Sequence, residues 1–262
     1  MLGIGNSLVY PSVLGGFENN YSLSLDGTGD YLDLKNHFRS IHQGSFTWSC
    51  WVKADDGQPS SAQVFIGGGI FRFTEAFSLS IQTTGKILML FAADGEIVQY
   101  ETDSAQFANG ASDWKHIACR VIKNTSANTT YSIFVNGSEV ATSNAGGGGE
   151  MTDSNHAAHA NDKYIYVGGW NNNDSLANPF KGKIDEVALW STDLSGANIA
   201  KVYNSGVPFD LTTNQGNYTG KGELEAYFRM EEGSGSTVEN TMASGEAADM
   251  QGDAAFSTDV PE

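Results

Sequence analysis

The stretch of sequence that decides the fold is residues 180–206, FKGKIDEVALWSTDLSGANIAKVYNSG. Its first half alternates with the period of a β-strand. One strand face carries Asp185, Val187 and Leu189, and the other carries Ile184, Glu186, Ala188 and Trp190. Because both faces are mostly apolar, the pattern predicts a strand within a sheet that is covered on both sides. The carboxylates near its start then need partners, such as a cation, a basic side chain or backbone N–H groups.

The second half of this stretch predicts a short helix. Ser195 can cap its first turn, and Gly206 can end it. Asn198 occupies the position where a capping box carries Glu or Gln, so the cap is only half supported. The apolar stripe of the helix comprises Ile199, Val202 and Tyr203.

Short strands separated by turn residues fill most of the remaining chain. We expect them at residues 21–25, 31–34, 46–52, 64–66, 77–81, 86–92, 97–100, 114–121 and 131–135. Asn136-Gly137 is a strong signal for a hairpin turn. Repeated short strands of this kind predict an all-β, antiparallel two-sheet sandwich.

Several of these motifs together resemble laminin-G-like domains, which are jelly-roll sandwiches related to legume lectins and pentraxins. The G-x-I-D-E-V-x-L-W run followed by V-Y-N-S-G resembles the closing strand and helix of that family. SFTWSCWVKADD resembles its aromatic core strand, and DWKHIACRVIKNTSANTTYSIFVNGSEVATS resembles its paired strands. The resemblance covers residues 17–212 and implies a concanavalin A-like jelly roll with one short helix after the 184–190 strand.

Residues 213–262 depart from the family pattern. LEAYFRMEEGSGSTV resembles the first strand of such a domain, but here it comes last. It either closes the same sandwich as a permuted strand or begins a truncated repeat. We favour closure, because an unpaired apolar edge strand promotes aggregation.

The order of the motifs is similar to that of laminin-G-like structural proteins of marine bacteriophages. This resemblance implies a non-enzymatic protein on the virion exterior, as a capsid decoration or a fibre or tail component, assembled in the host cytoplasm. Residues 1–16, an apolar segment interrupted by glycines, would then be an arm that attaches to other virion proteins. The start lacks the features of a signal peptide, and no apolar run reaches the length of a membrane helix. A homo-oligomer is compatible with this interpretation.

The net charge of the chain limits the classes of partner that it can bind. The chain has 31 acidic and 14 basic residues and a net charge of −17. Such a charge repels nucleic acids and anionic membranes and favours divalent cations. The alternative is that it serves only solubility in a salty medium.

Enzymatic activity is not expected. Glucanases of the lectin-like fold pair a nucleophile with an acid/base residue in E-x-D-x-E or E-x-D-x-x-E motifs, and neither occurs in this sequence. A glycoside hydrolase is therefore the least favoured interpretation. His156 and His159 lie in the glycine-rich segment 143–162, which we expect to be a mobile, solvated loop.

Carbohydrate binding, including host surface glycans, is the alternative function. Trp170 offers a stacking platform, and its neighbours Asn171, Asn172, Asn173 and Asp174 offer hydrogen-bond donors and acceptors. The competing interpretation is that Trp170 belongs to the core and the asparagines form a turn.

Calcium is the cofactor that the sequence indicates. The family resemblance and the local chemistry point to Asp185 together with Asp26 or Asp30, since Ca²⁺ prefers hard oxygen ligands. The competing interpretation is that Asp185 accepts backbone hydrogen bonds or pairs with a lysine.

The two cysteines, Cys50 and Cys119, are each displaced by one residue from the pattern of the pentraxin disulfide. We expect them to be close together but reduced, because cytoplasmic assembly disfavours disulfides.

Overall fold

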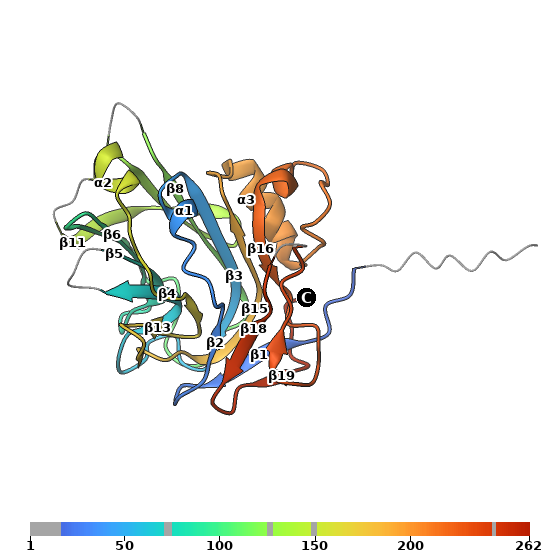
Figure 1. Ribbon diagram of the computed structural model, residues 1–262. Helices are drawn as coiled ribbons and strands as arrows, with labels where there is room; N and C mark the ends of the chain where they lie inside the picture. Colours follow the sequence, from blue (N-terminus) through green and yellow to red (C-terminus); the bar gives the residue numbers. More distant parts are fainter. Residues whose placement is uncertain (1–16, 71–74, 125–127, 148–150, 243–244) are drawn as a thin grey trace, which may run out of the picture.

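The computed structural model describes residues 17–70, 75–124, 128–147, 151–242 and 245–262. The predicted attachment arm, residues 1–16, lies outside the described residues. Two sheets, whose strands pair antiparallel apart from one short bridge, stack face to face as a sandwich (Figure 1). The predicted all-β jelly-roll class is therefore confirmed.

The first sheet has eight strands among the described residues. In spatial order they are β10 (Ser138–Val140), β9 (Thr130–Val135), β8 (Lys115–Ile122), β3 (Phe46–Ala54), β15 (Lys181–Trp190), β1 (Ser22–Asp26) and β19 (Ala255–Ser257), with β16 (Leu224–Phe228) also paired to β15. The predicted hairpin turn joins β9 to β10, where Asn136 and Gly137 both have positive φ.

In the part of the chain that the structure describes, the second sheet has eleven strands. Its main path is β11 (Thr142–Gly147), β7 (Glu96–Thr102), β6 (Ile87–Ala93), β5 (Glu75–Ile81), β4 (Gln63–Ile70), β12 (Tyr166–Val167), β2 (Tyr31–Asp33), β18 (Ala248–Gln251) and β17 (Thr237–Val238). The hairpin β13 (Trp170–Asn171) and β14 (Leu176–Ala177) branches from β4. The helices are short: α1 (Arg39–His42), α2 (Asp153–Ala157) and α3 (Gly196–Tyr203), with 3₁₀ turns at Asn204–Gly206 and Gly220–Glu223.

Strand β15 is buried on both faces, as predicted, but its alternation is interrupted. The register with β3 shifts between Asp185 and Ala188, and Glu186 has a left-handed φ of 49°. These features define a β-bulge, in which one strand carries an extra residue and its side chains change faces. Ile184 therefore points into the core between the sheets with Val187 and Leu189, instead of sharing a face with Ala188 and Trp190 as predicted.

Helix α3 covers the outer face of the eight-stranded sheet (Figure 1). Ser195 caps it as predicted, because its Oγ accepts a hydrogen bond of 3.2 Å from the Asn198 backbone N–H. Ile199 and Val202 are buried against the sheet. The helix ends at Tyr203, before Gly206, because Asn204 already adopts the left-handed conformation.

The C-terminal segment supplies strands to both sheets. β16 pairs with β15 and β19 pairs with β1 in the first sheet, while β18 pairs with β2 in the second. Figure 1 shows these red strands beside the blue strands from the start of the described chain. The segment is thus an integral part of the sandwich core, to which Phe228, Met230 and Val238 contribute fully buried side chains.

The glycine-rich segment 143–162 corrects the sequence-based expectation of a solvated loop. It contains most of β11 and all of α2, and its side chains His156 and His159 are fully buried. Both imidazoles stack on Phe91, with ring centroids 4.7 and 5.0 Å away, and His159 also contacts His42. Contacts with aromatic rings of the core therefore fix His156 and His159, although the polar composition of their segment alone predicts mobility.

Cys50 and Cys119 lie on the paired strands β3 and β8, two residues apart in register, and both are buried free thiols. The expectation that they are close together is confirmed, and that they are reduced in the cell stays a prediction. Burial raises the pKa of both thiols, so neither is an easily ionised nucleophile.

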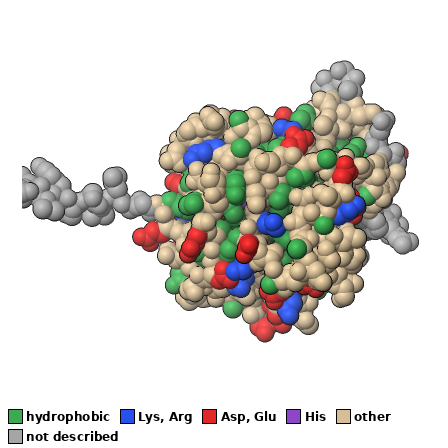
Figure 2. Space-filling model, turned by 180° about the vertical axis from the view of Figure 1, so that it is seen from behind, with side chains coloured by type: hydrophobic (Ala, Val, Ile, Leu, Met, Phe, Trp, Pro, Cys, Tyr) green, Lys and Arg blue, Asp and Glu red, His purple; other side chains and the backbone are tan. Residues whose placement is uncertain are grey.

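The acidic excess does not form a single patch on the face shown in Figure 2, where basic side chains lie next to acidic ones. Within the described residues, no helix is long and apolar enough to cross a membrane.

Acid should destabilise the fold through its buried histidines. Burial lowers the pKa of His156 to about 4 and that of His159 to about 3. The unfolded chain therefore takes up these protons first, so the stability that the neutral histidines contribute is complete above about pH 6.5 and is lost as the pH falls toward 4. We expect the free energy of unfolding to fall by about 1.4 kcal/mol per pH unit for each histidine.

Urea unfolding at a series of pH values between neutral and acidic measures this slope. The double variant His156→Phe, His159→Phe keeps the aromatic packing but cannot titrate, so its slope should be shallower than that of the wild type. If the free energy of unfolding fell equally with pH in the double variant and the wild type, His156 and His159 would not be the source of the acid sensitivity.

Candidate functional site

Three carboxylates meet where the turn between β1 and β2 lies against the turn between β18 and β19. One oxygen atom from each of Asp26, Asp30 and Asp253 lies within 4.8 Å of the other two. Asp30 is buried, and it accepts hydrogen bonds of 2.9 Å from the backbone N–H groups of Asp26 and Asp253. None of the salt bridges between described residues involves these three side chains. A divalent cation would relieve their mutual repulsion, and carboxylate oxygens suit Ca²⁺.

Asp185 does not join this group, so the predicted combination of Asp185 with Asp26 or Asp30 is corrected. The antiparallel register pairs Asp26 with Lys181, which places Asp185 four residues further along β15, roughly 13 Å away. Instead, Asp185 accepts hydrogen bonds of 2.9 Å from the Glu186 backbone N–H and 3.1 Å from Asn19 Nδ2. Asp253, which the sequence analysis missed, takes its place at the turn.

Glu186 belongs to a buried polar network next to Asp185. Its carboxylate accepts hydrogen bonds from the Tyr227 hydroxyl and, at 3.4 Å, from Arg229 Nε. Arg229 also donates to the backbone carbonyl of Glu18 and lies 4.1 Å from the centre of the Phe17 ring. The network therefore fastens the first described residues to the end of β16.

The Asp185–Glu186 pair lacks the geometry of a catalytic carboxylate pair. The two side chains are adjacent in one bulge and are 0% and 3% exposed. Burial raises the pKa of Glu186 to about 8 and holds that of Asp185 well above its usual range. Glycoside hydrolysis needs two carboxyl groups that flank an accessible bond, so we assign this pair a structural role.

The predicted sugar-binding segment, residues 170–174, is a β-hairpin turn. Asn173 and Asp174 have φ of 53° and 65°, and the backbone groups of Asn172 and Ser175 bond to each other at 2.9 and 3.2 Å. Two central residues with positive φ are typical of a type I′ turn, which favours Asn and Asp. Asn171 is buried, and its Oδ1 accepts a 2.7 Å bond from the Asp174 backbone N–H.

Trp170 is partly buried on the outer face of the eleven-stranded sheet. It packs against Ala76, Leu90 and Ala92, and its Nε1 donates a 3.0 Å hydrogen bond to the Gly69 carbonyl. Asn172 and Asn173 remain exposed at the hairpin tip. Turn formation and packing thus account for most of this segment, and ligand binding by it stays a prediction.

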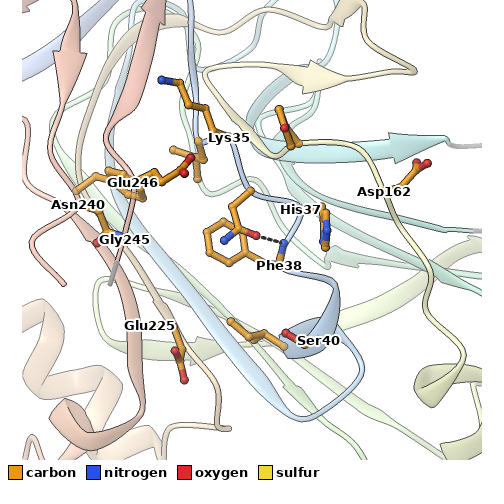
Figure 3. Close-up of a pocket in the computed structure, with 14 residues that line it drawn as sticks. Lys35, His37, Phe38, Ser40, Asp162, Glu225, Asn240, Gly245 and Glu246 are labelled. Carbon is orange, nitrogen blue, oxygen red and sulfur yellow. Dashed lines mark hydrogen bonds between the residues drawn. The ribbon is translucent and has the colours of Figure 1, made fainter. Parts of the chain in front are cut away.

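A hollow of about 900 Å³ lies at the edge of the sandwich. We call it the rim pocket; its lining comprises residues 34–38, 40–41, Asp162, Tyr164, Glu225, Phe228, Asn240 and 245–246. In Figure 3, Phe38 lies centrally, with His37 and Asp162 on one side and Asn240 and Glu246 on the other. The β2–α1 connection, the segment before β12 and the C-terminal segment each form part of the lining. Its volume falls within the range of small-molecule sites.

Two amides in the rim pocket are already oriented. Asn36 Oδ1 accepts a 2.7 Å hydrogen bond from the Phe38 backbone N–H, and Asn240 Oδ1 accepts bonds of 3.0 and 3.1 Å from the backbone N–H groups of Tyr227 and Met242. With the oxygens fixed, the Nδ2 groups have no hydrogen-bond partner among the described residues and can donate to a ligand. His37 Nδ1 accepts from the Arg39 backbone N–H at 3.0 Å, which leaves its Nε2–H as a further donor.

Tyr164 gives the rim pocket an aromatic surface. Its side chain is 45% exposed, whereas Trp170 is largely covered, and the only other large exposed hydrophobic residue in the described chain is Val207. Sequence analysis missed Tyr164. The sequence pattern that could have identified Tyr164 is the alternation of residues 164–167, in which Ile165 and Val167 enter the core.

The rim pocket therefore combines an exposed ring, oriented amide donors and carboxylate acceptors. This set can bind a polar ligand with one apolar face through stacking and hydrogen bonds. Nothing in it requires a covalent step.

Comparison with protein families gives one match. Residues 26–200 match the family model described as the concanavalin A-like lectin/glucanases superfamily. Among curated proteins, none matches this sequence significantly.

Solved structures share the fold at low sequence identity. A protein of Bacteroides ovatus described as a candidate carbohydrate-binding protein aligns with a TM-score of 0.57 and 18% identity, over 94% of this chain and 62% of the other. This chain thus spans less than two thirds of that protein's length. The CBM40 of Ruminococcus gnavus IT-sialidase aligns with a TM-score of 0.55 and 18% identity, over 70% of this chain and 96% of the other. That module has also been solved bound to α2,6 sialyllactose.

Calcium should stabilise the protein through the Asp26, Asp30 and Asp253 cluster, because an ion that binds only the folded chain shifts the unfolding equilibrium. We expect a higher melting temperature in CaCl₂ than in EGTA. Asp253→Asn should reduce this shift, whereas Asp185→Asn, a matched change outside the cluster, should leave it in place. Thermal unfolding followed by circular dichroism measures both. An identical wild-type melting temperature in CaCl₂ and EGTA would contradict calcium binding.

Proposed function

This chain belongs to the concanavalin A-like lectin/glucanase superfamily, and we propose that it is a non-enzymatic carbohydrate-binding protein that takes its glycan in the rim pocket. The observation that carries the proposal is that the exposed Tyr164 and two oriented amides line the same hollow of about 900 Å³. Sugars present an apolar face of C–H groups and a rim of hydroxyls, so an aromatic ring with flanking donors and acceptors complements them.

Two further features support this assignment. The sandwich shares its fold with structures of carbohydrate-binding modules, so the scaffold is compatible with glycan binding. In addition, the most deeply buried carboxylate pair, Asp185 and Glu186, is closed off from solvent. A binding module therefore agrees better with the geometry than a hydrolase does.

Tyr164→Ala tests the proposal. Loss of the ring should weaken glycan binding by about tenfold or more, which corresponds to about 1.4 kcal/mol. Val207→Ala removes the other large exposed apolar side chain, which does not line the rim pocket, and should leave affinity unchanged. A panel of neutral and charged oligosaccharides, screened by array and quantified by calorimetry, measures both variants. If the Tyr164→Ala variant still bound glycan with wild-type affinity, the binding site would have to lie elsewhere on the sandwich.

We propose, as the biological setting, that the sandwich is displayed on the exterior of a phage particle. This rests on the resemblance of the motif order to virion proteins of marine bacteriophages, and host glycans would then be the ligands. The residues that follow the proposed arm are held by the sandwich: Phe17 and Glu18 contact Arg229, and Asn19 donates a hydrogen bond to Asp185.

Deleting residues 1–16 tests this setting. The truncated chain should remain folded, because every strand within the described residues lies after residue 21, but it should no longer be incorporated into particles. Circular dichroism reports the fold, and quantification of the protein in purified particles reports incorporation. If the truncated protein were incorporated into particles at full occupancy, attachment would have to reside on the surface of the sandwich.

A further inference from the structure

The rim pocket is acidic. Its lining contains three carboxylates, Asp162, Glu225 and Glu246, and one basic side chain with a permanent charge, Lys35. Figure 3 shows Asp162 on the side opposite Glu246, and Glu225 below Glu246 in the view. A ligand in the rim pocket would thus meet carboxylates on several sides.

The charge of Lys35 is already compensated. Its Nζ lies 2.8 Å from Asp249 Oδ2, and this hydrogen bond, with Glu246 contributing, raises the pKa of Lys35 above its ordinary value. By contrast, neither Asp162 nor Glu246 forms a salt bridge with any described residue, and both are exposed. Glu225 accepts a 2.6 Å hydrogen bond from the Ser191 hydroxyl. The lysine therefore provides little free positive charge for an anionic ligand.

Charge of this sign discriminates between classes of sugar. A carboxylate on a sugar, such as that of sialic acid, would be repelled by Asp162 and Glu246, and the net charge of −17 adds to the repulsion at long range. A protonated amino group would instead be attracted and could form charge-assisted hydrogen bonds with either carboxylate. The three pre-oriented N–H donors, from Asn36, Asn240 and His37, remain available for neutral hydroxyls.

We propose that the rim pocket selects glycans that carry free amino groups and excludes glycans that carry carboxylates. This inference rests on the proposed carbohydrate-binding function. The proposed ligand class differs from the sialyllactose with which the structurally similar CBM40 has been solved. At 18% identity the two chains share a fold, but the charge of a binding site depends on side chains that need not be shared.

Two matched pairs of ligands test the selectivity: the glucosamine tetramer against the N-acetylglucosamine tetramer, and sialyllactose against lactose. Calorimetry at mildly acidic pH, where the amino groups are protonated, should show the glucosamine tetramer binding up to about fivefold more tightly than its acetylated form, since one ion pair with an exposed carboxylate has an effect of at most that order. High salt should reduce this ratio. Sialyllactose should bind more weakly than lactose.

Matched variants separate the pocket charge from the net charge of the protein. Asp162→Asn with Glu246→Gln should bring the glucosamine to N-acetylglucosamine affinity ratio close to one. Glu96→Gln with Asp113→Asn removes the same number of charges from exposed positions outside the rim pocket and should preserve the ratio.

The outcomes are distinct. Sialyllactose binding at least as tightly as lactose, or a ratio that the pocket variant does not change, would overturn the charge selection while the proposed function stands. Failure of all four glycans to bind the wild type would overturn the proposed function, and the selectivity with it.

Discussion

The structure depends on how strand β15 buries two consecutive carboxylates. A carboxyl group taken out of water without hydrogen-bond partners destabilises the fold even when it is neutral, so Asp185 and Glu186 need such partners. Their partners come from opposite ends of the described chain: Asn19 precedes the first strand, and Tyr227 and Arg229 lie in and directly after β16. The bulge at Glu186 directs both carboxylates away from the inter-sheet core and toward these partners. One local distortion thereby fixes both ends of the sandwich.

The position of β16 on β15 has a second consequence, because it builds the rim pocket. Glu225 and Phe228 belong to β16, and Asn240 follows it, held by the backbone of Tyr227. The remaining walls come from residues 34–41 and 162–164, which are distant in sequence. The candidate site therefore exists only when the C-terminal segment has closed the sandwich.

The fold of this protein does not identify its ligand. Two-sheet jelly rolls carry many unrelated binding sites, so the family match establishes the scaffold and the superfamily but leaves the ligand open. What this chain adds is local chemistry: an exposed tyrosine, amides fixed by backbone N–H groups and a surplus of carboxylates. The Asp26, Asp30 and Asp253 cluster is a separate feature on the opposing turns between strands.

The sequence by itself determined the features that depend on neighbouring residues: the strand pattern of the sandwich, the Asn136-Gly137 hairpin and the Ser195 helix cap. Each follows from a short-range preference of the backbone or a side chain. Only the tertiary structure decided that Asp253 joins Asp26, that His156 is buried on Phe91 and that Tyr164 opens onto a pocket. These contacts join segments far apart in the chain, and a bulge of one residue in β15 changes which side chains face the core. A two-residue period cannot reveal where such an extra residue lies, because the pattern on either side of it remains regular.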